Sequence, residues 1–255
     1  LVTWYNTIMI NHWSWRTGFL TYAALALILA GVARMFIRNT PREIGQYKDG
    51  IPPEDQPRKG MGKPAVTPAP KIGKAVFAVF VLCALGFQLP WSLVVAHGRL
   101  HLEDLGFGLG AISVLFGSMT MLSVAGRLCG GLGDFMKPNL VLGVALLIEA
   151  SGLFLFLFAS YSIVAWIAII LLAIGFGGSY MSLSLVVSNY VGAERFSRTI
   201  GLIYLLAGFA NAPAPGIAGW MADTIGGYAI PFMSVSLATM VAGFFALRLK
   251  DLKAK

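Results

Sequence analysis

Seven apolar blocks, each about twenty residues or longer, alternate with short polar segments along the chain. A block of this length crosses the hydrocarbon core of a bilayer as a helix. The pattern predicts crossings at 17–37, 74–96, 108–132, 139–159, 161–190 and 199–222, and a last one that ends near residue 247. Residues 1–11 are too short to span and begin in apolar material, so we expect them to be the end of a preceding helix. The chain is therefore predicted to be an all-α polytopic membrane protein with seven transmembrane helices.

The composition supports a membrane protein and weakens other classes. Hydrophobic residues make up 57% of the chain and charged residues 12%, against about 25% charged in soluble proteins. The net charge of +8 does not indicate nucleic-acid binding, because Lys and Arg lie between the apolar blocks. Cys83 and Cys129 have neither C-x-x-C spacing nor a histidine cluster nearby, so no disulfide, metal or other cofactor is expected.

Residues 38–72 differ from the rest of the chain, because prolines occur there among charged residues with few large apolar ones. This composition predicts a hydrated linker between one crossing before it and a six-helix bundle at 73–248. Of the 19 Lys and Arg residues, all except Arg16 and Arg99 fall on one predicted side of the membrane. The positive-inside rule makes that side cytoplasmic, together with the linker and the tail at 249–255.

A short Gly-rich hairpin with charged residues, 126–138, separates two of the apolar blocks. If the preceding helix continues to Asp134, then Arg127 and Asp134 are seven residues apart on one helix face and can form an ion pair. The pair would act as a structural latch. Alternatively, Arg127 binds an anionic substrate, since a guanidinium offers bidentate hydrogen bonds to a carboxylate.

Several polar side chains stand within the apolar blocks, most of them close to helix-breaking Gly or Pro residues. They are Gln88, Ser92, Tyr180, Tyr204 and Asn211. Prolines inside spanning helices are tolerated where a neighbour or a water-filled cavity satisfies the freed carbonyl. These side chains either line a common cavity or form hydrogen bonds between helices.

Two further residues are candidates for carrying a proton. Glu149 lies near the middle of a crossing, where a carboxylate is costly and is a functional candidate by default. Its alternative is a protonated side chain that is hydrogen-bonded to a neighbouring helix. His97 precedes a predicted outer polar loop with Arg99, His101, Glu103 and Asp104, and histidine titrates near neutral pH. A hydrated histidine without a role is the alternative.

Several motifs, in their order along the chain, resemble those of the major facilitator superfamily. Gly126–Asp134 is similar to the family's GR-x-x-x-G-x-x-D loop between helices eight and nine, and Asn211–Trp220 with Asp223 and Tyr228 resembles its helix-eleven signature. Thr40–Gly45, with Asp49-Gly50 after it, resembles the central loop of bacterial monocarboxylate-porter-like transporters. His97, ahead of the segment ending in Asp104-Leu105-Gly106, fits the same group.

The resemblance implies that the seven crossings are helices six to twelve of a twelve-helix transporter and that the N-terminal half is missing from the chain. Arg127 matches the helix-eight arginine that engages the substrate carboxylate in related carriers. Two departures qualify this match. The basic run that usually follows the hairpin aspartate is reduced to Lys137. The helix-eleven lysine of oxalate/formate exchangers is absent, which favours a substrate with a single carboxylate.

These observations predict a secondary active transporter, or a fragment of one, that moves a small organic anion, a monocarboxylate with a proton, by alternating access. We expect Gln88, Arg127, Tyr180, Tyr204 and Asn211 to bind substrate, His97 and Glu149 to couple protons, and Arg127 with Asp134 to latch. The expected location is the inner (plasma) membrane. The alternative is a sensor or assembly subunit without transport activity, built on half of a transporter fold. An enzyme is disfavoured, because Glu149 has no visible catalytic partner.

Overall fold

The computed structural model describes residues 12–38 and 72–250, together with residues 5, 8, 9, 43 and 45; the side chains of residues 193 and 194 are not described. The chain divides into two compact units, Leu1–Thr67 and Pro68–Lys255. Most of the predicted linker, of the predicted end of a preceding helix and of the motif at Thr40–Gly45 lies outside the described residues, as does the tail after residue 250.

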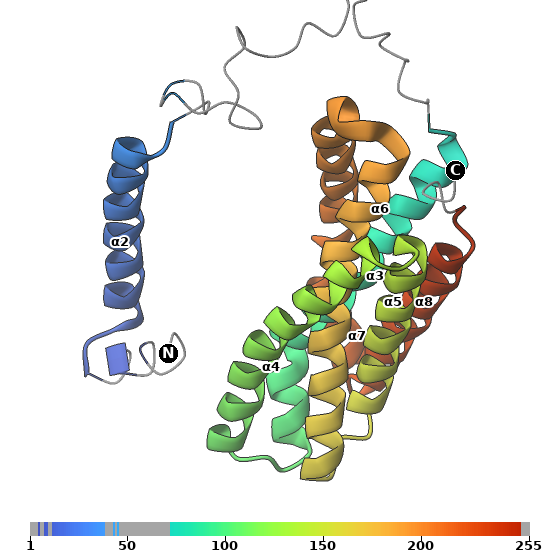
Figure 1. Cartoon of the computed structure of the whole chain (residues 1–255). Helices are drawn as coiled ribbons and strands as arrows, with labels where there is room; N and C mark the ends of the chain where they lie inside the picture. The colour runs from blue at the N-terminus through green and yellow to red at the C-terminus, as the bar shows by residue number, and fades with distance from the viewer. Residues whose placement is uncertain are drawn as a thin grey trace, which may run out of the picture. The chain divides into compact units, whose positions relative to one another are not determined.

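The first unit contains one long helix, α2, which spans Trp15–Phe36 (Figure 1). The hydroxyl of Ser14 accepts a hydrogen bond from the backbone N–H of Thr17 and so caps the first turn. Arg16 lies over the ring of Trp15, with 4.5 Å between the guanidinium carbon and the ring centroid. Aromatic and basic residues are typical of a spanning helix at the membrane boundary.

The second unit is a bundle of six membrane-crossing segments, coloured from cyan to red in Figure 1. Its elements are α3 (Lys74–Asp104), α4 (Leu109–Gly130), the 3-10 turn η3 (Gly131–Asp134), α5 (Pro138–Phe156), α6 (Ser162–Asn211), α7 (Ala214–Ile225) and α8 (Ala229–Leu247). Gly192, with φ 69° and ψ 171°, bends α6 and divides it between two crossings, Ser162–Gly192 and Arg195–Ile225. Seven segments of the described chain, α2 included, are long and apolar enough to span a bilayer, which confirms the predicted fold class.

The predicted outer loop after residue 96 is wrong, because α3 continues without interruption to Asp104. Arg99 and Glu103 lie one turn apart on this extension, and their side chains form an ion pair of 2.7 Å. Pairs at i and i+4 stabilise a helix where it leaves the apolar part of the membrane. The polar residues therefore extend the helix instead of ending it.

Pro90 lies inside this helix and does not interrupt it, although proline usually breaks or kinks a helix. A proline inside a helix leaves the carbonyl four residues earlier, that of Gly86, without its intrahelical donor. The hydroxyl of Thr239 on α8 donates a hydrogen bond of 2.8 Å to this carbonyl. A neighbouring helix thus supplies the missing donor, and α3 stays continuous.

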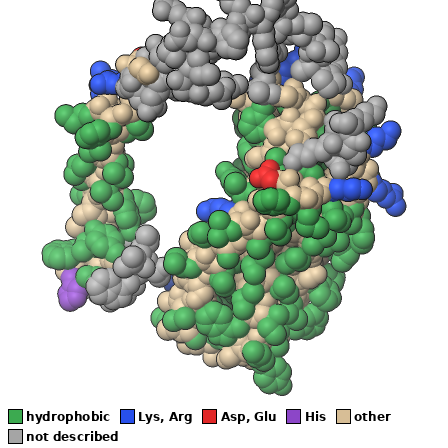
Figure 2. All heavy atoms as spheres, in the orientation of Figure 1, with side chains coloured by type: hydrophobic (Ala, Val, Ile, Leu, Met, Phe, Trp, Pro, Cys, Tyr) green, Lys and Arg blue, Asp and Glu red, His purple; other side chains and the backbone are tan. Residues whose placement is uncertain are grey.

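Small residues allow the helices of the bundle to approach closely. A Cβ added to Gly175 of α6 would collide with the backbone of Glu149 on α5, and one added to Gly86 of α3 would meet Ala242 of α8. Such contacts are the main source of helix association in lipid, because apolar tails remove the hydrophobic driving force. In Figure 2, apolar side chains cover the visible body of the bundle, and Lys and Arg gather near the end where α3 begins and α6 bends.

Replacing Thr239 with Val tests the role of the α8 hydroxyl. The substitution preserves side-chain shape but leaves the Gly86 carbonyl buried without a donor, which costs about 1–2 kcal/mol. We expect the unfolding temperature of the purified chain in detergent to fall by about 3–6 °C. Thr239→Ser, which keeps the hydroxyl, should lose less than half as much. Equal unfolding temperatures for Thr239→Val and the unsubstituted chain would contradict this role.

Candidate functional site

A cavity of about 330 Å³ lies between α3 and the two crossings that α6 provides. It is lined by Phe87, Gln88, Trp91, Ser92, Phe176, Tyr180, Tyr204 and Asn211. The cavity meets both buried apolar clusters of the bundle, since Phe87 belongs to one of them and Trp91 packs against the other. Four residues predicted to bind substrate, Gln88, Tyr180, Tyr204 and Asn211, thus surround one hollow.

Aromatic rings form the walls of this cavity. Trp91 stacks on Phe176 with 4.0 Å between centroids, and Tyr180 stacks on Tyr204 at 6.0 Å. Phe87 stands edge-on to Phe176, Tyr180 and Tyr204 at 5.8–6.3 Å. Offset and edge-on pairs of this kind hold the rings in place. The walls are therefore apolar and well ordered by packing.

Some polar groups of the cavity already form hydrogen bonds within the protein, and others do not. Ser92 donates a hydrogen bond of 2.8 Å to the side-chain oxygen of Asn211, which joins α3 to the end of α6. The amide of Gln88 makes no hydrogen bond with the described residues. The Tyr204 hydroxyl is buried and lacks a hydrogen-bond partner of ordinary geometry in the described part of the chain, although Ser184 lies near it. Gln88 and Tyr204 therefore retain hydrogen-bonding capacity.

Arg127 on α4 is exposed and is not among the residues that line this cavity, but it lies beside one of the cavity's walls. Its guanidinium carbon lies 5.8 Å from the centroid of the Tyr180 ring, at the distance of a cation–π contact. The position follows from backbone packing, because a Cβ on Gly177 of α6 would collide with the Ser123 carbonyl and with the N–H of Arg127. Only a residue without a side chain at Gly177 lets α4 bring Arg127 beside Tyr180.

Asp134, the predicted latch partner, ends the 3-10 turn η3 and is exposed. The α-helix before it ends at Gly130, so Arg127 and Asp134 do not share one regular α-helical face. In this conformation Arg127 and Asp134 do not form a salt bridge. Within the described part of the chain, the salt bridge is that of Arg99 with Glu103.

His97 lies on α3 beyond the cavity and does not line it. Its Nε2 is 2.7 Å from the backbone carbonyl of Pro215 on α7, and its ring stacks on Tyr228 with centroids 5.1 Å apart. Because a carbonyl only accepts, Nε2 carries the hydrogen, and the buried Nδ1 has no partner among the described residues. Partial burial and the nearby carboxylates of Asp223 and Asp104 raise the pKa of Tyr228, so its hydroxyl stays neutral.

Glu149 is fully buried between α5 and α6 and is separate from the cavity. The hydroxyl of Ser179 on α6 lies 3.4 Å from its Oε2, while Oε1 has no partner in the described part of the chain. This geometry matches a side chain that is hydrogen-bonded to a neighbouring helix. An ionised carboxylate with one long hydrogen bond would be costly at this depth.

Three aromatic residues line the cavity in addition to the polar residues that the sequence predicted there. They are Phe87, Trp91 and Phe176. Their spacing carried a signal, since Trp91 follows Phe87 by four residues and Phe176 precedes Tyr180 by four. Residues four apart share a helix face, so these rings lie on the face that carries the polar candidates.

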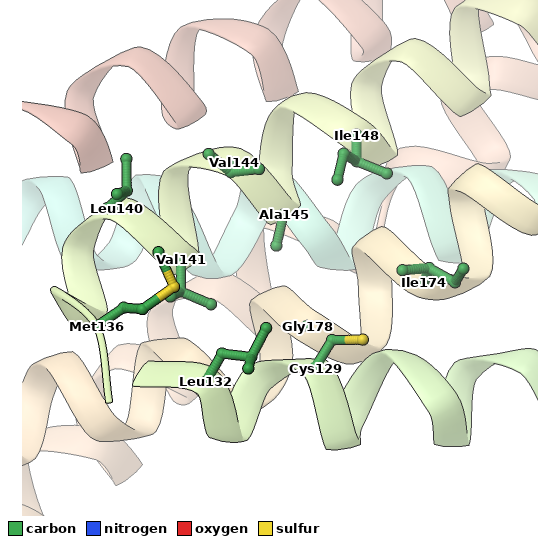
Figure 3. A pocket seen from close by; sticks show the side chains of 10 residues that line it. All are labelled: Cys129, Leu132, Met136, Leu140, Val141, Val144, Ala145, Ile148, Ile174 and Gly178. Atoms are coloured by element: carbon green, nitrogen blue, oxygen red, sulfur yellow. The ribbon is translucent and has the colours of Figure 1, made fainter. Parts of the chain in front are cut away.

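A second cavity, of about 330 Å³, lies between α4, η3, α5 and α6 and has a different character (Figure 3). Cys129 and Leu132 face Val141, Ala145, Ile148 and Ile174 across it, without a charged or hydrogen-bonding side chain in the lining. It offers nothing to hold an organic anion. The first cavity is therefore the candidate functional site.

Comparison with known proteins agrees with the fold. Residues 6–215 match the sequence model of the Major Facilitator Superfamily. Over 154 residues, or 59% of the chain, the sequence is 27% identical to monocarboxylate transporter 12-B of Danio rerio. That match spans 31% of the length of the fish protein, so the chain corresponds to a minor part of this relative. With most of its residues inside the family match and seven helices able to span a membrane, the chain belongs to the Major Facilitator Superfamily of multi-pass membrane transporters.

Proposed function

We propose that this chain is part of a secondary transporter that moves a small monocarboxylate together with a proton by alternating access. The observation that carries the proposal is the cavity between α3 and α6, with Arg127 beside its Tyr180 wall. A positive side chain next to aromatic walls and unused hydrogen-bonding groups suits a short anion with a small apolar body. The similarity to a monocarboxylate transporter points to the same class of substrate.

The anion is held by Arg127 in this proposal. A guanidinium donates two parallel hydrogen bonds to a carboxylate, and such charge-assisted pairs are about twice as strong as neutral ones. Gln88 and the Tyr204 hydroxyl provide further donors within the cavity. The rings of Phe87, Trp91 and Phe176 enclose the apolar part of the substrate.

The six helices from α3 to α8 form one wall of the transport pathway. In transporters built from repeated halves, substrate binds between the two halves near the middle of the membrane. We propose that a preceding set of helices supplies the opposite wall and that α2 is the last helix of that set. The central linker and the tail then lie in the cytoplasm, and the protein resides in the plasma membrane.

Substituting Arg127 tests the anchor. In counterflow of labelled monocarboxylates into proteoliposomes, with the full-length gene product, we expect Arg127→Gln to weaken substrate affinity by about 100-fold. Arg127→Lys keeps the charge but loses the planar fork, and should weaken affinity about tenfold. The matched control is Arg99→Gln, which removes an arginine that pairs with Glu103 and contacts no wall of the cavity. Unchanged affinity in Arg127→Lys would show that this residue is not the anchor, and absence of counterflow in the unsubstituted protein would favour a sensor or assembly subunit.

The latch is a second proposed role of Arg127 and requires a conformation in which Asp134 approaches it. Asp134→Asn separates this role from the anchor. Loss of a latch changes the rate of exchange and leaves substrate affinity within about twofold, because the anchor is intact. An Asp134→Asn protein with unaltered exchange rates would remove the latch from the mechanism.

Proton coupling is proposed for His97, with Glu149 as a second proton-carrying residue. A protonated His97 is a partly buried cation whose Nδ1–H has no acceptor among the described residues, and movement of α7 away from α3 would let water solvate this charge. This change would link the proton to opening of the outer end.

His97→Gln tests the coupling, because the amide can still donate to the Pro215 carbonyl but does not titrate. We expect counterflow to stay within about threefold of the unsubstituted protein, because exchange needs no net proton movement. Uptake driven by an inward proton gradient should fall by about tenfold or more. External alkalinisation on substrate addition reports the coupling directly. If alkalinisation were the same in His97→Gln and the unsubstituted protein, His97 would not carry the proton.

A further inference from the structure

A third cavity, of about 510 Å³, lies at the end of the bundle where α3 begins and α6 bends. It is lined by Ile72, Phe77, Val191, Arg195, Arg198, Thr199 and Leu202. The cavity is far along α3 from the proposed substrate site, whose first lining residue on that helix is Phe87. None of its lining residues takes part in the proposed transport mechanism.

The backbone places this cavity at the boundary of the membrane. The crossing formed by α3 begins at Lys74, and the crossing Arg195–Ile225 begins at one of the lining arginines. Between the two crossings of α6, Gly192 adopts φ 69°, in the left-handed region that glycine tolerates. The bend sets Val191 before it and Thr199 after it around the same hollow. A ligand here would therefore lie where lipid headgroups meet the acyl chains.

The lining combines an apolar wall with a basic edge. Phe77, Val191 and Leu202 supply the apolar surface, and Arg195 and Arg198 are exposed beside it. Within the described part of the chain, Arg198 forms no hydrogen bond or ion pair. The hydroxyl of Thr199 adds a neutral donor. One end of a suitable ligand is therefore anionic and the other end is hydrocarbon.

The surroundings strengthen the attraction for an anion. Lys74 and Lys137 are exposed outside the cavity, and the Lys and Arg side chains of the bundle gather near this end in Figure 2. A basic residue in contact with an anionic headgroup strengthens lipid binding by about fivefold, whereas residues farther away, such as these, add less because salt screens them. A free phosphate ion would leave the apolar wall unused, whereas a phospholipid uses both parts of the lining.

We propose that this cavity binds an anionic phospholipid. The headgroup phosphate lies against Arg195 and Arg198, and the part of an acyl chain next to the headgroup lies against Phe77 and Leu202. The lipid would bridge the start of α3 and the bend of α6. This site is independent of the transported substrate, since no residue is shared with the cavity that contains Gln88.

Native mass spectrometry of the purified full chain, titrated with dioleoylphosphatidylglycerol or dioleoylphosphatidylcholine, tests the proposal. We expect the anionic phosphatidylglycerol to bind at least about tenfold more tightly than the zwitterionic phosphatidylcholine. The double variant Arg195→Gln/Arg198→Gln should lose about 25-fold in affinity for phosphatidylglycerol, at about fivefold for each charge. The control variant Lys137→Gln/Arg248→Gln removes two charges from outside the cavity and should lose less than threefold.

Each other outcome overturns the proposal. Equal losses in the two double variants would show attraction to the general surface charge, and equal binding of the two lipids would show that the headgroup charge is not recognised. Displacement of phosphatidylglycerol by millimolar inorganic phosphate would identify a site for free anions. If the double variant does not elute as a folded protein in size-exclusion chromatography, the single variant Arg198→Gln decides, with about fivefold weaker binding expected and unchanged binding as the contradicting result.

Discussion

Close contact between the backbones of α4 and α6 at Gly177 is the constraint on which the candidate site depends. No other residue type fits there, because a Cβ would strike the Ser123 carbonyl and the N–H of Arg127. In a bilayer, helices are held together by such packing and by hydrogen bonds rather than by the hydrophobic effect. The same contact that stabilises the bundle therefore determines that a guanidinium lies beside Tyr180. Stability and the proposed anion site share one structural cause.

The hydrogen bonds between helices follow a related logic. Thr239 satisfies the carbonyl that Pro90 frees, Ser92 joins Asn211 at the end of α6, and His97 joins the Pro215 carbonyl on α7. Each of these hydrogen bonds joins α3 to another helix, at or near a proline or a helix end. Thr239 is fully buried, so water does not compete for its bond, and each of the three bonds holds α3 against a particular neighbour. Movement of the bundle in transport would require some of them to break.

The sequence was sufficient for the crossings, because the length of an apolar block is a local property. It also identified the polar residues that gather in the cavity, since a polar side chain in lipid needs a partner or a hollow. The sequence did not predict contacts between residues that are far apart along the chain. The donor that keeps α3 continuous at Pro90 comes from distant Thr239. The pair of Arg99 with Glu103 is by contrast a local i, i+4 contact, which the sequence spacing already offered. The spacing of Phe87 and Trp91 places both rings on the α3 face that carries Gln88, but that this face meets Phe176 and Tyr180 of α6 is a tertiary contact that the sequence pattern does not encode.

Protection of an introduced cysteine tests whether the carboxylate substrate binds in the cavity between α3 and α6. In the full-length protein with Cys83→Ala and Cys129→Ala, Gln88→Cys places a thiol in the cavity, and Lys137→Cys places one on an exposed loop. A transported monocarboxylate should slow labelling of the cavity thiol by a small, water-soluble thiol reagent by about tenfold or more. The amide of the same acid should not slow it, and the loop thiol should label equally under all conditions. Equal labelling of the cavity thiol with and without the monocarboxylate would contradict the account.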